Sequence, residues 1–261
     1  MPGNTESLEK NNLTAFDTPD TRVKVNFWPA KLDLAQSISG LLLALFMWGH
    51  MFLVSSILIS EQAMYHVAKM FEGYYLFGRS YPWLVSLVVG GVFVLFMLHA
   101  LLAMRKLPHN YAQLSDFSSH NQRMNHPDTR LWWVQAVSGF LLFFFAPMHL
   151  FGMFSQPDQI GPYMSAWRVY STHWSLYLVL LLLVELHGGI GLYRLVVKWV
   201  SLPVKTEVIW KRRLNLFKWS LTTFFVVLGL ATLFAYYQLG ETLQNHPTRV
   251  FTLIQDEEPG L

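Results

Sequence analysis

Cysteine is absent from the 261 residues, and charged residues make up only 13% of them. The absence of cysteine excludes disulfides, cysteine-ligated iron–sulfur clusters and thioether-attached haem within this chain. The charged share is about half that of an average soluble domain. Because 53% of the residues are hydrophobic, the composition is typical of an integral membrane protein.

The segment at 1–32 lacks the apolar run behind a basic start that marks a cleavable signal peptide. We therefore expect it to be an extramembrane N-terminal segment, with the first membrane helix acting as the insertion signal. A second polar stretch, at 241–261, is expected to form a C-terminal tail.

Five apolar runs are long enough to cross a bilayer, which takes about 20 residues. They are 34–60, 81–104, 131–155, 169–193 and 219–240. The joins between them are polar and contain Gly or Pro, as turns commonly do. The sequence therefore predicts an all-α fold, a bundle of five transmembrane helices within 33–240.

Lysine and arginine are unevenly distributed between the two sides of this bundle. Fifteen of the nineteen lie in the N-terminal segment, the second loop or the fourth loop. Only Lys69, Arg79, Arg168 and Arg249 lie on the other side. Since cytoplasmic flanks hold the excess of basic residues, we expect a cytoplasmic N-terminus and a periplasmic C-terminus. The orientation in the membrane thus accounts for the excess of basic over acidic residues, and no nucleic-acid partner is needed to explain it.

One pattern occurs twice, at 36–50 and at 135–149. Each copy begins with Gln, passes through a Ser-Gly pair and ends with a His fourteen positions after the Gln. The terminal histidines are His50 and His149, and two other spans carry His99 and His187. A single intramembrane histidine is readily explained by a hydrogen bond to a neighbouring helix. One on each of four spans indicates function, because ionisable groups at this depth are rare.

Depth along the helices divides these histidines into two pairs. At about 1.5 Å per residue, His50 and His149 lie near the outer side, and His99 and His187 lie near the inner side. Two imidazoles at one level match the axial ligands of a haem, whereas zinc prefers three or four ligands. We therefore predict two haems b, with scattered structural histidines as the alternative. The small neighbours that would admit a flat ring are Gly49, Ala100, Gly188 and Gly189.

Polar residues at the span ends are candidates for binding haem propionates. On the inner side they are Gln36, Ser37, Trp132 and Lys198, and on the outer side Arg168. Basic residues also commonly anchor helix ends at lipid headgroups. Propionate binding and headgroup anchoring therefore both remain possible roles for Lys198 and Arg168.

Two glutamates are candidates for proton transfer. Glu185 lies inside the fourth span, where a carboxyl group is costly unless it is protonated or paired. Because it precedes His187 by two residues, the two side chains point away from each other on a helix. We expect it to transfer protons, with a locally hydrogen-bonded structural role as the alternative. On chemistry alone, Glu72 is an ordinary solvated loop residue.

Several strings in the sequence resemble one known family. They are Gly49-His50-Met51-Phe52, Leu98-His99-Ala100-Leu101-Leu102-Ala103-Met104-Arg105-Lys106 and Glu185-Leu186-His187-Gly188. They closely resemble the dihaem cytochrome b anchor subunits of quinol:fumarate reductases, in the succinate:quinone oxidoreductase family. The similarity extends from about Pro29 through Trp199. It implies a multi-pass subunit of the bacterial inner membrane that oxidises menaquinol and transmits electrons through two haems.

The resemblance also implies partners and residue roles. A cytoplasmic iron–sulfur subunit and a flavoprotein subunit would reduce fumarate, and a dimer of heterotrimers is compatible with this, although the sequence leaves the oligomeric state open. Glu72 would be the base at the quinol site near the outer surface, and Glu185 would carry protons inward. The four inner polar residues would lie near the propionates of the inner haem, which His99 and His187 would bind.

Three other interpretations are compatible with the sequence. The same architecture can serve a succinate:quinone reductase working in the reverse direction, because haem potentials depend on hydrogen bonds and burial. A haem-free structural anchor would use the histidines only to join helices. A proton-coupled transporter fits less well, because the repeat relates two spans of the same direction rather than inverted halves.

Overall fold

The computed structural model describes residues 26–108, 110–124, 127–201 and 203–245. The predictions for 1–25 and 246–261, which include most of the N-terminal segment and of the tail, lie outside the described residues. Within the described ranges every regular element is helical, with no strand. The all-α prediction is confirmed.

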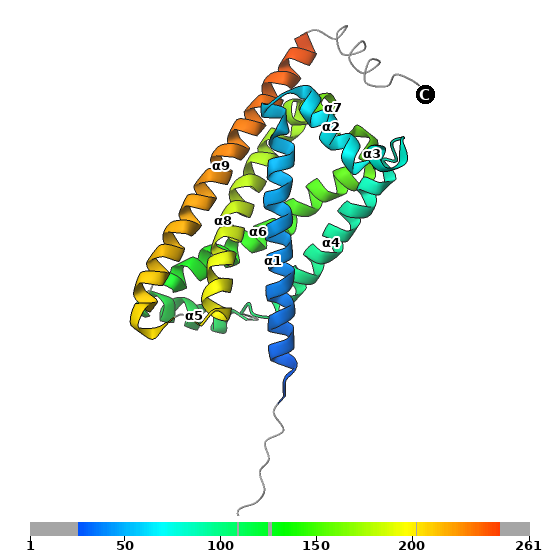
Figure 1. Ribbon diagram of the computed structural model, residues 1–261. Helices are drawn as coiled ribbons and strands as arrows, with labels where there is room; N and C mark the ends of the chain where they lie inside the picture. The colour runs from blue at the N-terminus through cyan, green and yellow to red at the C-terminus, as the bar shows by residue number, and fades with distance from the viewer. Residues whose placement is uncertain (1–25, 109, 125–126, 202, 246–261) are drawn as a thin grey trace, which may run out of the picture.

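Five helical stretches in the described part are long and apolar enough to cross a membrane, so the predicted multi-pass bundle is confirmed. Their main helices are α1 (Trp28–Val54), α4 (Trp83–Met104), α6 (Pro127–Ser155), α8 (Trp174–Trp199) and α9 (Glu207–Asn245). Figure 1 shows them running between two ends of the molecule, with the N-terminal part of α1 at the lower end.

Short helices cover the two ends of the bundle. At the upper end in Figure 1 lie α2 (Glu61–Phe71), α3 (Tyr74–Phe77) and α7 (Pro162–Arg168), and at the lower end lies α5 (Tyr111–Met124). We call the upper end the Glu72 end and the lower end the Asp33 end, after residues described below. Single turns complete the connections: η1 (Ser55–Leu58), η2 (Pro157–Gln159), the π-helix η3 (Val169–His173) and η4 (Val204–Thr206).

The helix of the fifth span is longer than the apolar run 219–240 that predicted it. This helix begins at Glu207, so the second part of the predicted fourth loop, 207–218, is helical. Lysine and arginine are good helix formers, and Lys211 pairs with Glu207 at 2.7 Å one turn away. Lys218 is 2% exposed, with its ammonium 4.4 Å from the Trp219 ring centre. The apolar run therefore marks the hydrocarbon-facing part of this helix and not its full length.

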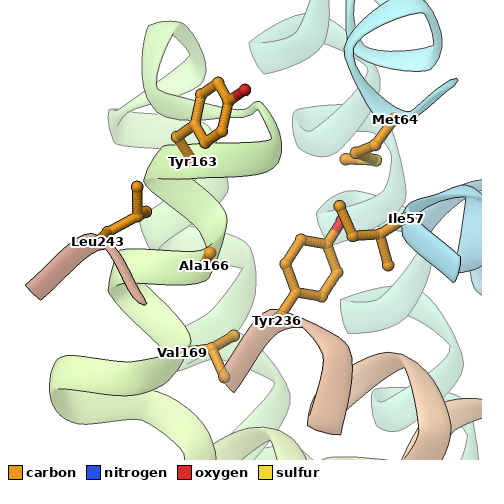
Figure 2. Packing of buried hydrophobic residues seen from close by; sticks show 7 residues of the cluster. All are labelled: Ile57, Met64, Tyr163, Ala166, Val169, Tyr236 and Leu243. Atoms are coloured by element: carbon orange, nitrogen blue, oxygen red, sulfur yellow. The ribbon is translucent and has the colours of Figure 1, made fainter. Parts of the chain in front are cut away.

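A cluster of buried apolar residues lies at the Glu72 end, where α2, α7 and α9 meet η1 and η3. Figure 2 shows its members, Ile57, Met64, Tyr163, Ala166, Val169, Tyr236 and Leu243. In contrast, large apolar side chains such as Leu87 and Phe151 are exposed on the spans, as expected for a surface that faces lipid. This cluster holds the long α9 against the short helices that close the cavity described below.

We predict that Gly240→Ala lowers the stability of the bundle. A Cβ atom at Gly240 would lie 2.5 Å from the carbonyl oxygen of Ala166, so α7 and α9 would have to move apart. The expected cost is about 1–3 kcal/mol, measured as a fall in the apparent Tm of the detergent-solubilised protein. Gly91→Ala is the control, because a Cβ there meets nothing within 4 Å. Equal Tm values for the two variants would contradict the close packing.

Candidate functional site

A long cavity of about 1310 Å³ runs through the bundle. Gln36 and Lys198 line it at the Asp33 end, and Glu72 and Arg168 line it at the Glu72 end. Pockets for one small ligand typically measure about 300–1,000 Å³, so this cavity has room for more than one. Its wall is mostly apolar, and all four span histidines are part of it.

The four histidines form two facing pairs within this cavity. The ring centres of His50 and His149 are 6.2 Å apart, and those of His99 and His187 are 6.3 Å apart. Two metal–nitrogen bonds of about 2 Å, plus ~1 Å from each nitrogen to its ring centre, add up to ~6 Å. The distance between the ring centres of each pair therefore leaves room for one metal atom between two imidazoles. The first pair lies toward the Glu72 end and the second toward the Asp33 end.

Hydrogen bonds fix the tautomer of the second pair. The Nδ1 atom of His99 lies 3.2 Å from the carbonyl oxygen of Gln36, and that of His187 lies 2.9 Å from the carbonyl oxygen of Gln135. A carbonyl only accepts, so in both rings Nδ1 carries the proton. The lone pair is then on Nε2, where an axial ligand of iron needs it.

Apolar and aromatic side chains surround the other pair. The His50 ring stacks parallel on Phe46 with centres 5.9 Å apart, and His149 meets Tyr177 edge-on at 5.4 Å. Within the described chain, Nδ1 of His149 is buried and has no hydrogen-bond partner, and the same holds for Oε1 of Gln36. Buried polar atoms are normally satisfied, so these two atoms fit a cavity built to hold a ligand.

A bare metal ion is a poor fit to this ligand set. Across the ranges that the structure describes, no three His, Cys, Asp or Glu side chains converge as a metal-binding group. Two imidazoles on opposite sides of a wide apolar space match a planar macrocycle that supplies the remaining ligands itself.

The small residues predicted to admit such a ring divide into two groups. Gly49, Ala100 and Gly188 line the cavity. The expectation for Gly189 was wrong, because a Cβ atom there would collide with the hydroxyl of Thr222. That glycine instead allows α8 to pack closely against α9.

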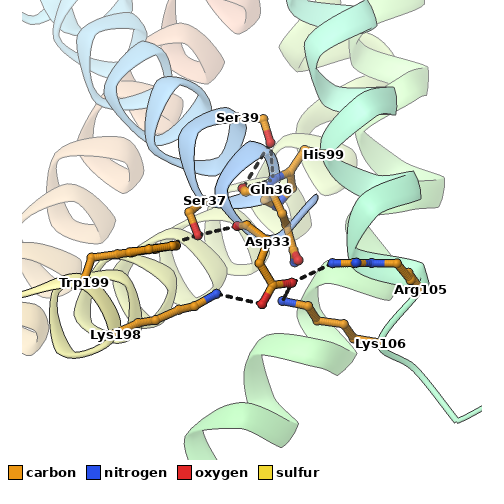
Figure 3. A network of polar contacts seen from close by, with 9 residues as sticks. All are labelled: Asp33, Gln36, Ser37, Ser39, His99, Arg105, Lys106, Lys198 and Trp199. Atoms are coloured by element: carbon orange, nitrogen blue, oxygen red, sulfur yellow. Dashed lines mark hydrogen bonds and ion pairs between the residues drawn. The ribbon is translucent and has the colours of Figure 1, made fainter. Parts of the chain in front are cut away.

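An ion-pair network centred on Asp33 closes the Asp33 end of the cavity (Figure 3). The Asp33 carboxylate accepts from Arg105 at 2.6 Å, Lys106 at 2.9 Å and Lys198 at 3.1 Å. These partners come from the end of α4, the segment after it and the end of α8, so one side chain joins three parts of the bundle. Sequence reasoning missed Asp33, because hydropathy marked it only as the start of the first span.

The other polar residues predicted at this end lie beside the network. The Ser37 hydroxyl donates to the carbonyl oxygen of Asp33 at 2.8 Å and accepts from the Trp199 indole at 2.9 Å. Ser37, Gln36, Trp132 and Lys198 all line the cavity. The structure therefore brings the four residues together with the His99–His187 pair at one end.

Glu72 is not the solvated loop residue that its chemistry alone suggested. It follows the last residue of α2, is 3% exposed, lines the cavity and accepts from Lys69 at 2.9 Å. Its carbonyl oxygen accepts from the backbone N–H of Tyr81 at 2.8 Å, which ties the start of α4 to α2. A buried carboxylate with a single lysine partner is thus held beside the His50–His149 end of the cavity.

Arg168 lies at the same end, immediately before the π-helix η3. Its guanidinium donates to the carbonyl oxygen of Gln159 at 3.3 Å, and the residue lines the cavity. Its guanidinium therefore lies at the cavity wall near the His50–His149 pair.

Glu185 faces away from the cavity, as its spacing from His187 predicts. It is fully buried and is not among the lining residues of the described chain. Oε2 accepts from the Trp48 indole at 3.4 Å, and Oε1 has no partner in the described chain. The helix α8 thus presents an imidazole on one face and a carboxyl group on another.

Comparisons with known proteins agree with the strings quoted above. Residues 112–230 match the family described as the transmembrane subunit of succinate dehydrogenase/fumarate reductase. The chain is 48% identical over 230 residues to the fumarate reductase cytochrome b subunit of Helicobacter pylori, covering 86% of both chains. It is also 48% identical over 213 residues to the subunit of the same name from Wolinella succinogenes, covering 81% of this chain and 83% of that one.

We predict that Asp33→Asn loosens the Asp33 end of the bundle. The substitution leaves three neighbouring cations without their shared carboxylate, at an expected cost of about 1–2 kcal/mol because the network is partly exposed. Thermal unfolding in detergent measures the loss, which high salt should reduce. The control is Glu207→Gln, which removes one surface pair with Lys211 and should change the Tm little. Equal, small effects would show that the network is not structural.

Proposed function

The chain belongs to the family of fumarate reductase cytochrome b membrane subunits, and we propose that it oxidises menaquinol and passes the electrons to partner subunits that reduce fumarate. The observation that carries the proposal is that one cavity contains two histidine pairs and has Glu72 in its wall. The ring centres are 6.2 Å apart in one pair and 6.3 Å apart in the other. Both relatives are fumarate reductase subunits by name, which favours this direction over succinate oxidation.

Two haems b are the proposed cofactors, one held by His50 and His149 and the other by His99 and His187. When bound, they would supply one-electron carriers at two depths of the membrane. Gln36, Ser37, Trp132 and Lys198 are proposed to bind the propionates at the Asp33 end, and Arg168 those at the Glu72 end. Cations and N–H donors suit carboxylates at these positions.

Glu72 is proposed as the base of the quinol site. Oxidation of menaquinol to menaquinone releases two protons and two electrons. A buried carboxylate at the cavity wall can take a proton from a quinol hydroxyl. The Lys69 ammonium lies 2.9 Å from this carboxylate and holds it in place at the cavity wall. A quinol at this end would lie next to the His50–His149 level.

Glu185 is proposed to transfer protons along a route separate from the cavity. A charged carboxylate at this depth is costly unless it is paired, and the Trp48 N–H at 3.4 Å is the one hydrogen-bond donor found for it in the described chain. Such a group is suited to hold and release a proton. Its position on α8 between α1 and α9 keeps the proton away from the apolar space that would hold the cofactors.

The Asp33 end is proposed to face the cytoplasm and the Glu72 end the periplasm of a bacterial inner membrane. The excess of lysine and arginine supports this orientation. An iron–sulfur subunit and a flavoprotein subunit would then bind at the Asp33 end, beside the His99–His187 pair. A dimer of such heterotrimers is the proposed assembly.

The reduced-minus-oxidised spectrum of the purified subunit tests the haem proposal. We expect a b-type α-band that titrates as two components. His50→Ala and His149→Ala should each remove the same component, and His99→Ala and His187→Ala the other, because each substitution would remove one of the two histidines that hold that haem. The exposed His66→Ala is the control. A spectrum without an α-band, or loss of different components within a pair, would overturn the proposal.

Glu72→Gln tests the quinol base. The amide keeps the shape of the side chain but cannot accept a proton, so quinol oxidation should fall at least ~10²-fold with both haems retained. Glu61→Gln, at the start of α2, is the control, because an amide oxygen can still accept from Tyr163. Haem loss in the Glu72 variant, with or without loss of activity, would indicate a structural role instead.

A further inference from the structure

The sequence repeat contributes to both histidine pairs. The terminal histidine of each copy, His50 or His149, belongs to the pair nearer the Glu72 end. The Gln and the Ser-Gly at the start of each copy instead contact the other pair. We call each set of Gln, Ser and Gly a histidine seat: Gln36, Ser39 and Gly40 on α1, and Gln135, Ser138 and Gly139 on α6.

The α1 seat holds His99 of α4 by two oxygen atoms. Nδ1 of His99 lies 3.1 Å from the Ser39 hydroxyl oxygen and 3.2 Å from the Gln36 carbonyl oxygen. Ser39 is 2% exposed, and its hydroxyl donates back to the same carbonyl at 3.1 Å. Because that proton points to the backbone, the hydroxyl oxygen is free to accept from the ring N–H.

The α6 seat holds His187 of α8 in the same way. Nδ1 of His187 lies 2.9 Å from the Gln135 carbonyl oxygen and 3.5 Å from the Ser138 hydroxyl oxygen. The Ser138 hydroxyl donates to the carbonyl of Val134 at 2.7 Å, so its oxygen also faces the ring as an acceptor. The longer distance makes this second contact weaker than that of Ser39.

The glycine of each seat allows the ring to come this close. A Cβ atom at Gly40 would lie 2.7 Å from Cε1 of His99, and one at Gly139 would lie 2.6 Å from Cε1 of His187. Any larger residue would push the ring off its two acceptors. In each seat the serine therefore provides a hydroxyl oxygen that accepts from the ring, and the glycine that follows it leaves space for the ring because it has no side chain.

His149 provides the contrast. Its Nδ1 atom is buried without a hydrogen-bond partner in the described chain. The seats thus hold His99 and His187. In the described chain no carbonyl or hydroxyl oxygen accepts from Nδ1 of His149 in the same way.

We propose that Ser39 and Ser138 are positioning residues that lower the reduction potential of the haem held by His99 and His187. This inference rests on the proposed function, because it concerns ligands of that haem. An acceptor on Nδ1–H makes the imidazole a stronger electron donor through Nε2, which stabilises ferric iron relative to ferrous iron. Two acceptors on one N–H strengthen that effect and also fix the orientation of the ring.

Potentiometric titration of Ser39→Ala tests the proposal. The variant keeps the carbonyl acceptor, so both haems should remain bound. At a fixed ambient potential, the ratio of reduced to oxidised haem should rise about threefold, or ~30 mV for a one-electron couple. The affected component is identified as the one that disappears in His99→Ala. Ser138→Ala should give a smaller shift in the same direction, because its contact is longer.

The control is Ser155→Ala on α6, an exposed serine whose hydroxyl donates only to its own helix. It should leave both potentials unchanged. Gly40→Ala should reduce the binding of the same haem as His99→Ala while leaving the other bound. Two bound haems with unshifted potentials in both serine variants, or a shift of the other haem, would overturn this inference alone. A wild-type protein without b-type haem would instead overturn the proposed function.

Discussion

Nitrogen atoms buried among hydrocarbon side chains are normally hydrogen-bonded, and the two ends of this bundle differ in how the imidazoles meet that requirement. At the Asp33 end, backbone carbonyls and serine hydroxyls of α1 and α6 accept from the rings of α4 and α8. At the Glu72 end, Nδ1 of His149 has no hydrogen-bond partner among the residues that the structure describes. Helix packing, tautomer and cavity shape at the Asp33 end thus follow from a few short contacts.

The fold was predictable from hydropathy because lipid imposes a minimum apolar length on each span. The same reasoning failed for the start of α9, where Lys211 and Lys218 continue the helix beyond the apolar run. It also missed α2, which Ser60 caps, and α7, which begins at Pro162. Charged residues in the sequence mark where a span leaves the hydrocarbon layer of the membrane. A helix can continue past that point until a capping residue or a proline ends it.

For the candidate site, the spacing of the histidines along straight helices sufficed to group His50 with His149 and His99 with His187. The roles of Ser39 and Gly40 could not be derived in this way, since their partner lies about 60 positions away on another helix. Asp33 was missed for the same reason, because its three cations come together only in the folded bundle. The repeat was visible in the sequence. What the sequence did not show is that the Gln, Ser and Gly of each copy contact the His99–His187 pair, whereas the terminal histidines of the copies form the other pair.

The two histidine seats also describe the symmetry of the bundle. α1 with α4 and α6 with α8 are two equivalent hairpins, each pairing a seat with the histidine of the following span, and α9 has no counterpart. The residue of α4 that corresponds to Glu185 is Met97. On α8 the acid is enclosed because α9 supplies Thr222 at its backbone and Phe225, which stacks on Trp48. The fifth helix therefore breaks the twofold equivalence and lets one hairpin, but not the other, bury a protonatable group.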